Sequence, residues 1–161
     1  MYLQKKPRRW QCGITSFAMA LDVPVADLIA EIGHDGGAIP QALDHPRGFH
    51  VQELIDCCLK RGFAATPVEI FPVLMDPEGH HWAGHHLNLH DLNLRFYDTL
   101  YTTRGVIEGM GLRTGHMVAY DRGSIYDPDG YEYSSADFGI YNFEPLCAWR
   151  IDALTTVKVQ P

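Results

Sequence analysis

The feature that most constrains this chain is a short apolar run that begins on a cysteine, from Cys12 to Leu21. Its apolar residues recur at i, i+3, i+4 and i+7, so we expect a buried helix that starts at or beside Cys12. The first turn of a helix carries unpaired amides and the positive end of the helix dipole, which favour a thiolate over a thiol. The sequence therefore predicts that Cys12 is a nucleophile. The alternative is a small buried hydrophobe, a common role for cysteine.

A histidine and an aspartate more than one hundred residues later could serve as partners for this thiol. The segment 115–127 is typical of two short strands joined by a tight reversal, with His116 on the first strand and Asp127 at the end of the second. Such a hairpin brings the imidazole and the carboxylate together, which with a thiol makes a nucleophile, a base and an orienting group. Asp121 and Asp129 are rival carboxylates, but each is typical of a turn.

The order of these motifs resembles the papain-like peptidases that process bacteriocin leaders at a double glycine, and their stand-alone relatives. The resemblance rests on a Cys-Gly helix start, a Gly-His strand and an Asp-Pro strand end, and it spans roughly residues 4 to 152. It implies a papain-like fold, N-terminal helices packed on an antiparallel sheet, and thiol-dependent acyl transfer. Cys12 would attack, His116 would carry protons and Asp127 would orient the imidazole. The resemblance implies no particular substrate.

The same resemblance implies a second donor for the oxyanion, a glutamine side chain that typically lies six residues before the nucleophile. Lys6 is at that position here, so the chain departs from the family pattern. Gln4 is our preferred donor, through a two-residue insertion around 7–9, and Gln11 is the alternative. The backbone amide of Cys12 is the natural first donor.

A histidine-rich segment, 79–90, holds five of the nine histidines and raises the question of a metal site. Pairs of these histidines are four residues apart, but Gly84 disfavours the helix that would place each pair on one face. Trp82 also stands where a zincin motif would have its glutamate. We therefore expect a polar loop or a pH-responsive lid, with no metal and no other cofactor. Trp82 and Trp10 are candidate walls of a substrate groove, with core or rim packing as the alternative.

Periodicity and chain breakers predict the remaining elements. Helices are expected at 12–21, 24–32, 51–61 and 92–101, strands at 64–73, 105–109, 115–120, 124–127 and 141–151, and a loop at 34–48. Helices that precede antiparallel strands predict an α+β fold. Asp22 is expected to cap the second helix, and Cys57 and Cys58 to lie in the core or on a helix face.

Composition limits the domain organisation and the function classes. The chain has 161 residues, 46% of them hydrophobic, which is enough for one domain, expected over 1–153 with a frayed tail at 154–161. A formal charge of −7 disfavours nucleic-acid binding, and no stretch has the roughly 18 to 20 apolar residues that span a bilayer. Four cysteines without a disulfide pattern fit a reducing compartment, so we expect a cytoplasmic protein, bacterial or phage by analogy. The oligomeric state stays open.

The sequence thus predicts a thiol hydrolase that cleaves a peptide or isopeptide-type amide through a thioester, acting on a peptide or protein substrate. Two alternatives remain. The displaced glutamine favours a noncatalytic binding module on the same scaffold. A transferase or deamidase would use the same triad with a different acceptor.

Overall fold

The computed structural model describes residues 1–37, 48–68, 94–110, 115–135 and 143–155. Within these ranges the helices are α1 (Cys12–Leu21), α2 (Val25–Ile32), α3 (Val51–Lys60) and α4 (Leu94–Thr102). The strands are β1 (Phe63–Val68), β2 (Arg104–Met110), β3 (Gly115–Asp121), β4 (Ser124–Asp127), β5 (Tyr131–Ser134) and β6 (Glu144–Ala153). Three helices precede the first strand, and the predicted α+β class is confirmed.

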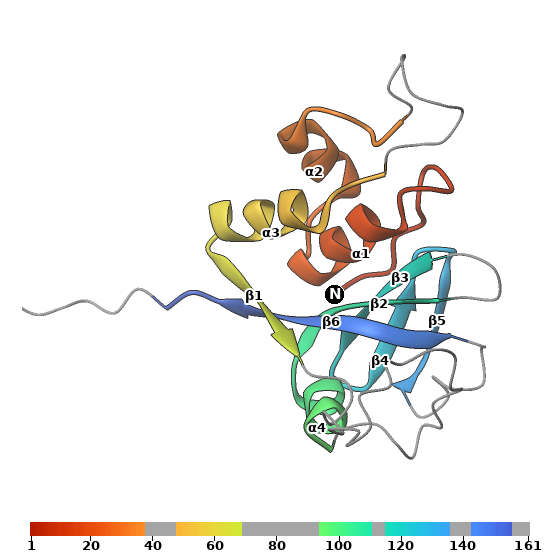
Figure 1. The fold of residues 1–161 in the computed structure, drawn as a ribbon, viewed down its shortest axis with the longest axis vertical. Coiled ribbons are helices and arrows are strands. Elements are labelled where there is room, and N and C mark those ends of the chain that lie inside the picture. Colours follow the sequence, from red (N-terminus) through yellow and green to blue (C-terminus); the bar gives the residue numbers. More distant parts are fainter. Residues whose placement is uncertain (38–47, 69–93, 111–114, 136–142, 156–161) are drawn as a thin grey trace, which may run out of the picture.

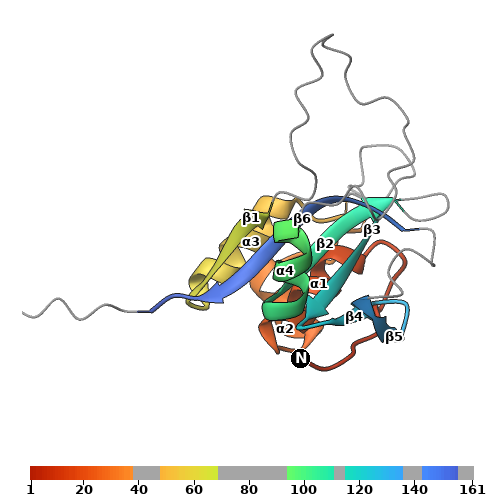
Figure 2. The ribbon, with the colours of Figure 1, turned by 90° about the horizontal axis from the view of Figure 1, so that it is seen from below.

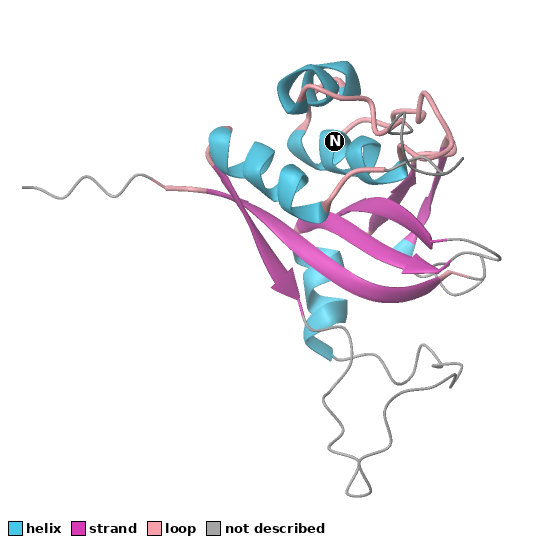
Figure 3. Cartoon of the chain, turned by 45° about the horizontal axis from the view of Figure 1, so that its top comes forward, coloured by secondary structure: helices cyan, strands magenta, loops and turns pink. Residues whose placement is uncertain are grey.

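The six strands form one sheet in the order β1-β6-β2-β3-β4-β5, and every neighbouring pair is antiparallel. The last strand, β6, returns to lie between β1 and β2. Helices α1, α2 and α3 cover one face of the sheet, whereas α4 lies against the opposite face (Figures 1 and 3). Figure 2 shows α4 in front of the sheet when the molecule is seen from below.

Each face of the sheet has its own cluster of buried side chains. On the face covered by α1, Phe17 is fully buried with Val106, and its ring lies 6.4 Å from that of Trp149. On the opposite face, Leu100 of α4 packs with Tyr120, which is also fully buried. The alternation of side chains along β2 and β3 produces both clusters, because successive residues point to opposite faces.

The connection between α1 and α2 differs from the prediction. We expected Asp22 to cap α2, but Asp22 ends α1 instead: its backbone is left-handed (φ 57°) and its N–H donates to the carbonyls of Ala18 and Met19. Pro24 is the residue that precedes α2. The carboxylate of Asp22 is turned toward the sheet, where it pairs with the Arg104 guanidinium at 2.7 Å. The predicted cap was therefore wrong because a tertiary ion pair holds the side chain.

The reversal between β3 and β4 has the predicted form. Arg122 and Gly123 both have positive φ, 45° and 94°, and Asp121 pairs directly with Ser124 across them. A two-residue loop of this type matches the twist of its flanking strands and sets their register. Strand β5 was not predicted, because it is a mostly exposed edge strand of only four residues, too short for its alternation of tyrosines and polar residues to stand out.

The cysteines are free thiols in different surroundings. Cys57 and Cys58 are buried on α3, which confirms that they belong to the core. Burial raises the pKa of Cys57 to about 11 and that of Cys58 to about 12. Cys147 is exposed on β6, and desolvation, with Glu108 nearby, also raises its pKa. These three thiols therefore stay protonated at neutral pH.

Among the described residues, no single helix is both long and apolar enough to cross a membrane. Helices α1 and α2 satisfy that test only when joined across a bend of 114°, and most of α1 is buried in the core.

Candidate active site

Helix α1 places Cys12 at the start of β3. The hydroxyl of Ser16, one turn into the helix, donates to the carbonyl of Met117 at 2.9 Å, and this contact is buried. The hydrogen bond joins α1 to the residue that follows His116. As a result the first residue of α1 and the beginning of β3 lie side by side.

The structure brings the three predicted residues together. His116 Nε2 lies 3.0 Å from Asp127 Oδ1, with 15% and 16% of the two side chains exposed. The same imidazole lines one cavity with Cys12 and is near enough to its sulfur for each group to shift the pKa of the other. Because Asp127 occupies Nε2, Nδ1 is the ring nitrogen left for the sulfur. The ring of Phe143 meets the imidazole edge-on, with the ring centroids 6.2 Å apart.

The register of β3 and β4 explains why Asp127 reaches His116. Ala119 pairs with Tyr126, and continuing this register puts Asp127 diagonally across from His116. Asp129 does not contact the imidazole in this structure: its backbone N–H donates to Asp127 Oδ1 at 2.7 Å, and its carboxylate pairs with another residue.

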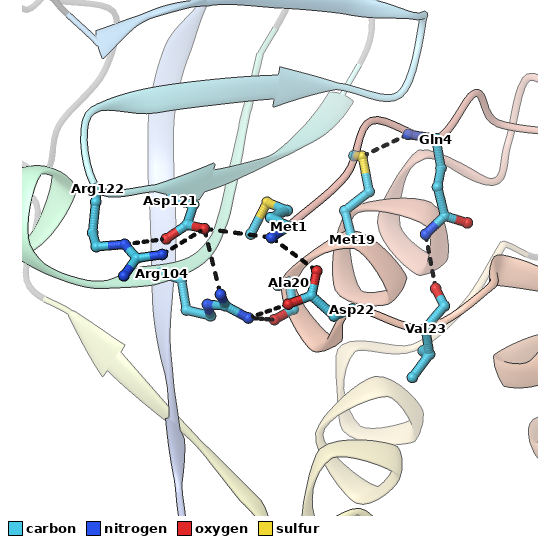
Figure 4. A network of polar contacts seen from close by, with 9 residues as sticks. All are labelled: Met1, Gln4, Met19, Ala20, Asp22, Val23, Arg104, Asp121 and Arg122. Atoms are coloured by element: carbon cyan, nitrogen blue, oxygen red, sulfur yellow. Dashed lines mark hydrogen bonds and ion pairs between the residues drawn. The ribbon is translucent and has the colours of Figure 1, made fainter.

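Asp121, the other rival, is in a different cluster. Its carboxylate contacts Arg122 at 2.9 Å and Arg104 at 3.4 Å. Figure 4 shows this cluster linking the N-terminal residue to the sheet. Of the three aspartates weighed from the sequence, Asp127 is therefore the one beside the imidazole.

The electrostatics of the site favour an ion pair between the thiol and the imidazole. Burial tends to raise the pKa of Cys12, but the hydrogen bond and charge of His116, the Met117 backbone and the charge of Lys6 together lower it. Burial tends to lower the pKa of His116, whereas Asp127 and Cys12 raise it to about 9. Asp127 has a lowered pKa because the His116 contact and the Asp129 N–H outweigh its desolvation. The lowered pKa of Cys12 and the raised pKa of His116 favour a thiolate and an imidazolium at neutral pH.

A cavity of about 240 Å³ opens beside Cys12 and His116. Trp10 lines it, as the sequence suggested, together with the apolar side chains of Phe49, Val51, Leu54 and Met117 and the carboxylate of Glu108. Sequence reasoning missed Phe49 and Glu108 as groove residues. Phe49 had a weak signal, as an aromatic residue at the junction of a glycine-rich loop and a helix, whereas Glu108 had none.

Gln4 is not at the site. Its amide Nε2 donates to the Val23 carbonyl at 2.7 Å, and its Oε1 accepts the Val25 N–H at 2.9 Å. Figure 4 shows the side chain pointing to the α1–α2 connection. The preference for Gln4 as oxyanion donor was therefore wrong, because its amide joins the N-terminal segment to the α1–α2 connection.

Gln11 directly precedes Cys12 and is 1% exposed. Its Nε2 donates to the carbonyl of Asp35 at 2.8 Å, while its Oε1 has no hydrogen-bond partner among the described residues. Nor does the Gln11 side chain cap α1 within the described part of the chain. The first-turn amides of the helix, including that of Cys12, thus remain as donors at the groove.

Trp82 and the histidine-rich segment 79–90 lie outside the described residues, as do positions 38–47 of the expected loop. The ends of that loop are described and lie close to the groove: the Gly48 N–H donates to the carbonyl of Gly36 at 2.9 Å. The Trp10 indole N–H donates to the carbonyl of Asp35 at 3.2 Å.

Among the described residues, His116, Asp127 and Asp129 have donor atoms within 4.8 Å of one another, so they could in principle hold a metal ion. Their contacts do not favour this reading. Asp127 accepts from His116, and Asp129 pairs with the ammonium of Lys6. A metal ion would have to displace the His116–Asp127 and Lys6–Asp129 contacts. These contacts already balance the negative charge of the two carboxylates.

Comparison with known proteins supports the fold. No protein-family model and no curated protein sequence matches the chain. In structure it is similar to the peptidase domain of Streptococcus ComA, a bifunctional ABC transporter involved in a quorum-sensing pathway. The TM-score is 0.55 and the identity 14%, over 95% of this chain and 98% of that one. At this identity the similarity establishes architecture, and the chain therefore has the papain-like cysteine peptidase fold, with N-terminal helices packed on an antiparallel sheet.

Proposed function

We propose that this protein is a cysteine hydrolase that cleaves a peptide or isopeptide-type amide, with Cys12 as nucleophile, His116 as acid and base, and Asp127 as the orienting group. One observation carries the proposal. A single imidazole hydrogen-bonds the Asp127 carboxylate and lies beside Cys12 at the edge of a groove, near enough to raise its own pKa and lower that of the thiol. A core cysteine needs no such neighbours: no imidazole in the described part of the chain is among the groups that act on Cys57 and Cys58, and their pKa values are raised.

The reaction proceeds in two halves. The Cys12 thiolate adds to the substrate carbonyl and forms a tetrahedral oxyanion. The carbon–nitrogen bond then breaks as His116 gives its proton to the departing amine, which leaves a thioester on Cys12. In the second half His116 takes a proton from water, the resulting hydroxide adds to the thioester, and the thiolate departs from the carboxylic acid.

The oxyanion needs donors aimed at the position where its charge develops. The Cys12 N–H is in the uncapped first turn of α1, beside the sulfur that attacks. Gln11 is the remaining side-chain candidate. Its Nε2 carries two hydrogens, and the Asp35 carbonyl accepts one of them, so the second is left to donate to the oxyanion. We include Gln11 in the proposal as the weaker donor.

The groove suits an extended peptide in a protein or peptide substrate. Trp10 and Phe49 form its aromatic walls, and β2 contributes Glu108.

A noncatalytic binding module is the second candidate function. The position of Gln4 favours it, because the amide donor implied by the family resemblance is engaged elsewhere.

Thiol labelling separates the two candidates. With iodoacetamide at about pH 6, Cys12 should react at least tenfold faster than the exposed Cys147, because only Cys12 is expected to be a thiolate there. The His116→Ala variant should lose this advantage, and Cys147→Ser should keep it. Cleavage of a peptide library by the native chain, but not by Cys12→Ala, would establish hydrolysis. Equal and slow labelling of Cys12 and Cys147 would favour the binding module.

A further inference from the structure

The segment that precedes α1 passes beside the turn that follows Asp127. The backbone N–H of Lys6 donates to the Pro128 carbonyl at 2.8 Å, and the Lys6 ammonium pairs with the Asp129 carboxylate. Only 17% of the Lys6 side chain is exposed, although lysine usually extends into solvent. Two separate contacts therefore hold this lysine against the turn.

The turn connects Lys6 to the candidate active site. The Asp129 N–H donates to Asp127 Oδ1, the same oxygen that His116 Nε2 contacts. The Gly130 N–H closes the turn by donating to the carbonyl of Asp127 at 2.8 Å. The contacts run without a break from Lys6 through Asp129 and Asp127 to the imidazole.

The charges around the site show why a cation in this position matters. The cations that act on the Cys12 sulfur include His116 and Lys6, and the same two cations act on the Asp127 carboxylate. Glu108 lines the groove from β2 and has the opposite sign. His116 gives up its proton during each turnover of the proposed reaction, whereas Lys6 takes no part in these proton transfers.

We propose that Lys6 is a positioning residue whose positive charge, held in place by Pro128 and Asp129, stabilises the anionic Cys12 sulfur through the Cys12–His116 ion pair. This inference rests on the function proposed above for those two residues. The family resemblance implies a neutral glutamine amide at position 6. In this chain the residue at that position is Lys6, whose charge stabilises the nucleophile. The charge acts on the sulfur from outside the groove, since Lys6 is not among the residues that line it.

The test measures the rate of Cys12 alkylation by iodoacetamide as a function of pH, with mass spectrometry of the labelled peptide. In Lys6→Gln, which keeps a donor for Asp129 but removes the charge, the midpoint of thiolate formation should rise by about one unit. Labelling at a pH at least about one unit below the native midpoint should then fall nearly tenfold, and it should recover fully at about pH 10. Lys6→Arg should retain the native profile.

Lys5→Met is the matched control, because it removes an equal charge from the exposed neighbouring side chain. It should leave the midpoint unchanged. Asp129→Asn removes the partner of Lys6 but leaves the charge, so its midpoint should stay within a few tenths of a unit of the native one. The inference is overturned if Lys6→Gln slows labelling equally at every pH, if its profile matches that of Lys5→Met, or if Asp129→Asn reproduces the shift.

Alkylation requires no substrate turnover, so this test is independent of the hydrolysis assay. If no peptide is cleaved and the Lys6→Gln midpoint still rises, the proposed hydrolase function fails while the electrostatic role of Lys6 stands. If peptides are cleaved and the midpoint does not move, the hydrolase stands and the role of Lys6 is wrong.

Discussion

At the scale of single residues, the contact between His116 and Asp127 links protein stability to pH. The pKa of Asp127 is lowered, so its contribution is present above about pH 4 and is lost as the pH falls through the folded value. The pKa of His116 is raised to about 9 from 6.5, so its contribution is complete below about pH 6.5 and is lost as the pH rises through about 9. The pair thus contributes most between about pH 4 and 6.5.

This linkage predicts the behaviour of Asp127→Asn, which keeps the shape of the side chain but removes its charge. Its free energy of unfolding should be about 1 to 2 kcal/mol below that of the native protein at about pH 6, and the difference should shrink toward zero at about pH 10. Urea denaturation at both pH values measures it. A difference that is equal at both would mean that the ion pair contributes nothing specific.

At the scale of elements, Gln4 joins the N-terminal segment to the connection between α1 and α2. Its side chain makes two hydrogen bonds to the backbone there, with Val23 and Val25. Gln4→Leu should lower the free energy of unfolding by about 1 to 3 kcal/mol, because it leaves partly buried backbone groups without partners. It should not change the pH profile of Cys12 labelling, because Gln4 lies away from the site.

Gln52 provides the matched control for this prediction. Its amide is exposed on α3 and bonds only the neighbouring Asp56 side chain, at 2.8 Å, among the contacts described. Gln52→Leu should change stability by no more than about 0.5 kcal/mol. If Gln4→Leu instead abolished peptide cleavage while stability stayed unchanged, Gln4 would regain the oxyanion role that its position here speaks against.

At the scale of the whole molecule, an ion-pair cluster fastens the N-terminal helices to the sheet. Arg104 of β2 contacts Asp22 at the end of α1 at 2.7 Å and Asp121 of β3 at 3.4 Å (Figure 4). Only 8% of the Asp121 side chain is exposed, so removing Arg104 would leave a buried carboxylate with fewer partners. The cluster therefore couples the layer that carries Cys12 to the layer that carries His116.

Arg104→Met should lower the free energy of unfolding by about 2 to 4 kcal/mol, measured by urea denaturation at about pH 7. The comparison is Arg150→Met, which breaks an exposed pair with Asp152 and should cost less than about 1 kcal/mol. Equal effects of the two variants would show that the cluster adds no more than a surface ion pair does.

Local patterns were sufficient to predict most elements of this chain. The helix at 12–21, the tight reversal at 121–123 and the core positions of Cys57 and Cys58 follow from periodicity and turn chemistry, which act over a few residues. Cys12, His116 and Asp127 could also be picked out from the sequence, because each residue stands near a recognisable boundary of a helix or strand. Strand β5 was missed because a four-residue edge strand is too short for its alternation to be a clear signal.

Only the tertiary structure decided which side chain does what once the elements are packed. Gln4 was expected to be the oxyanion donor and Asp22 to cap the second helix, yet contacts with residues far along the chain or in another layer determine where their side chains point. In the sequence, Lys6 stood only where the family resemblance implies a glutamine. In the folded protein it packs against the turn that follows Asp127. The physical reason is range: helix and turn propensities act between near neighbours, whereas charge and hydrogen bonding depend on distances that exist only after folding.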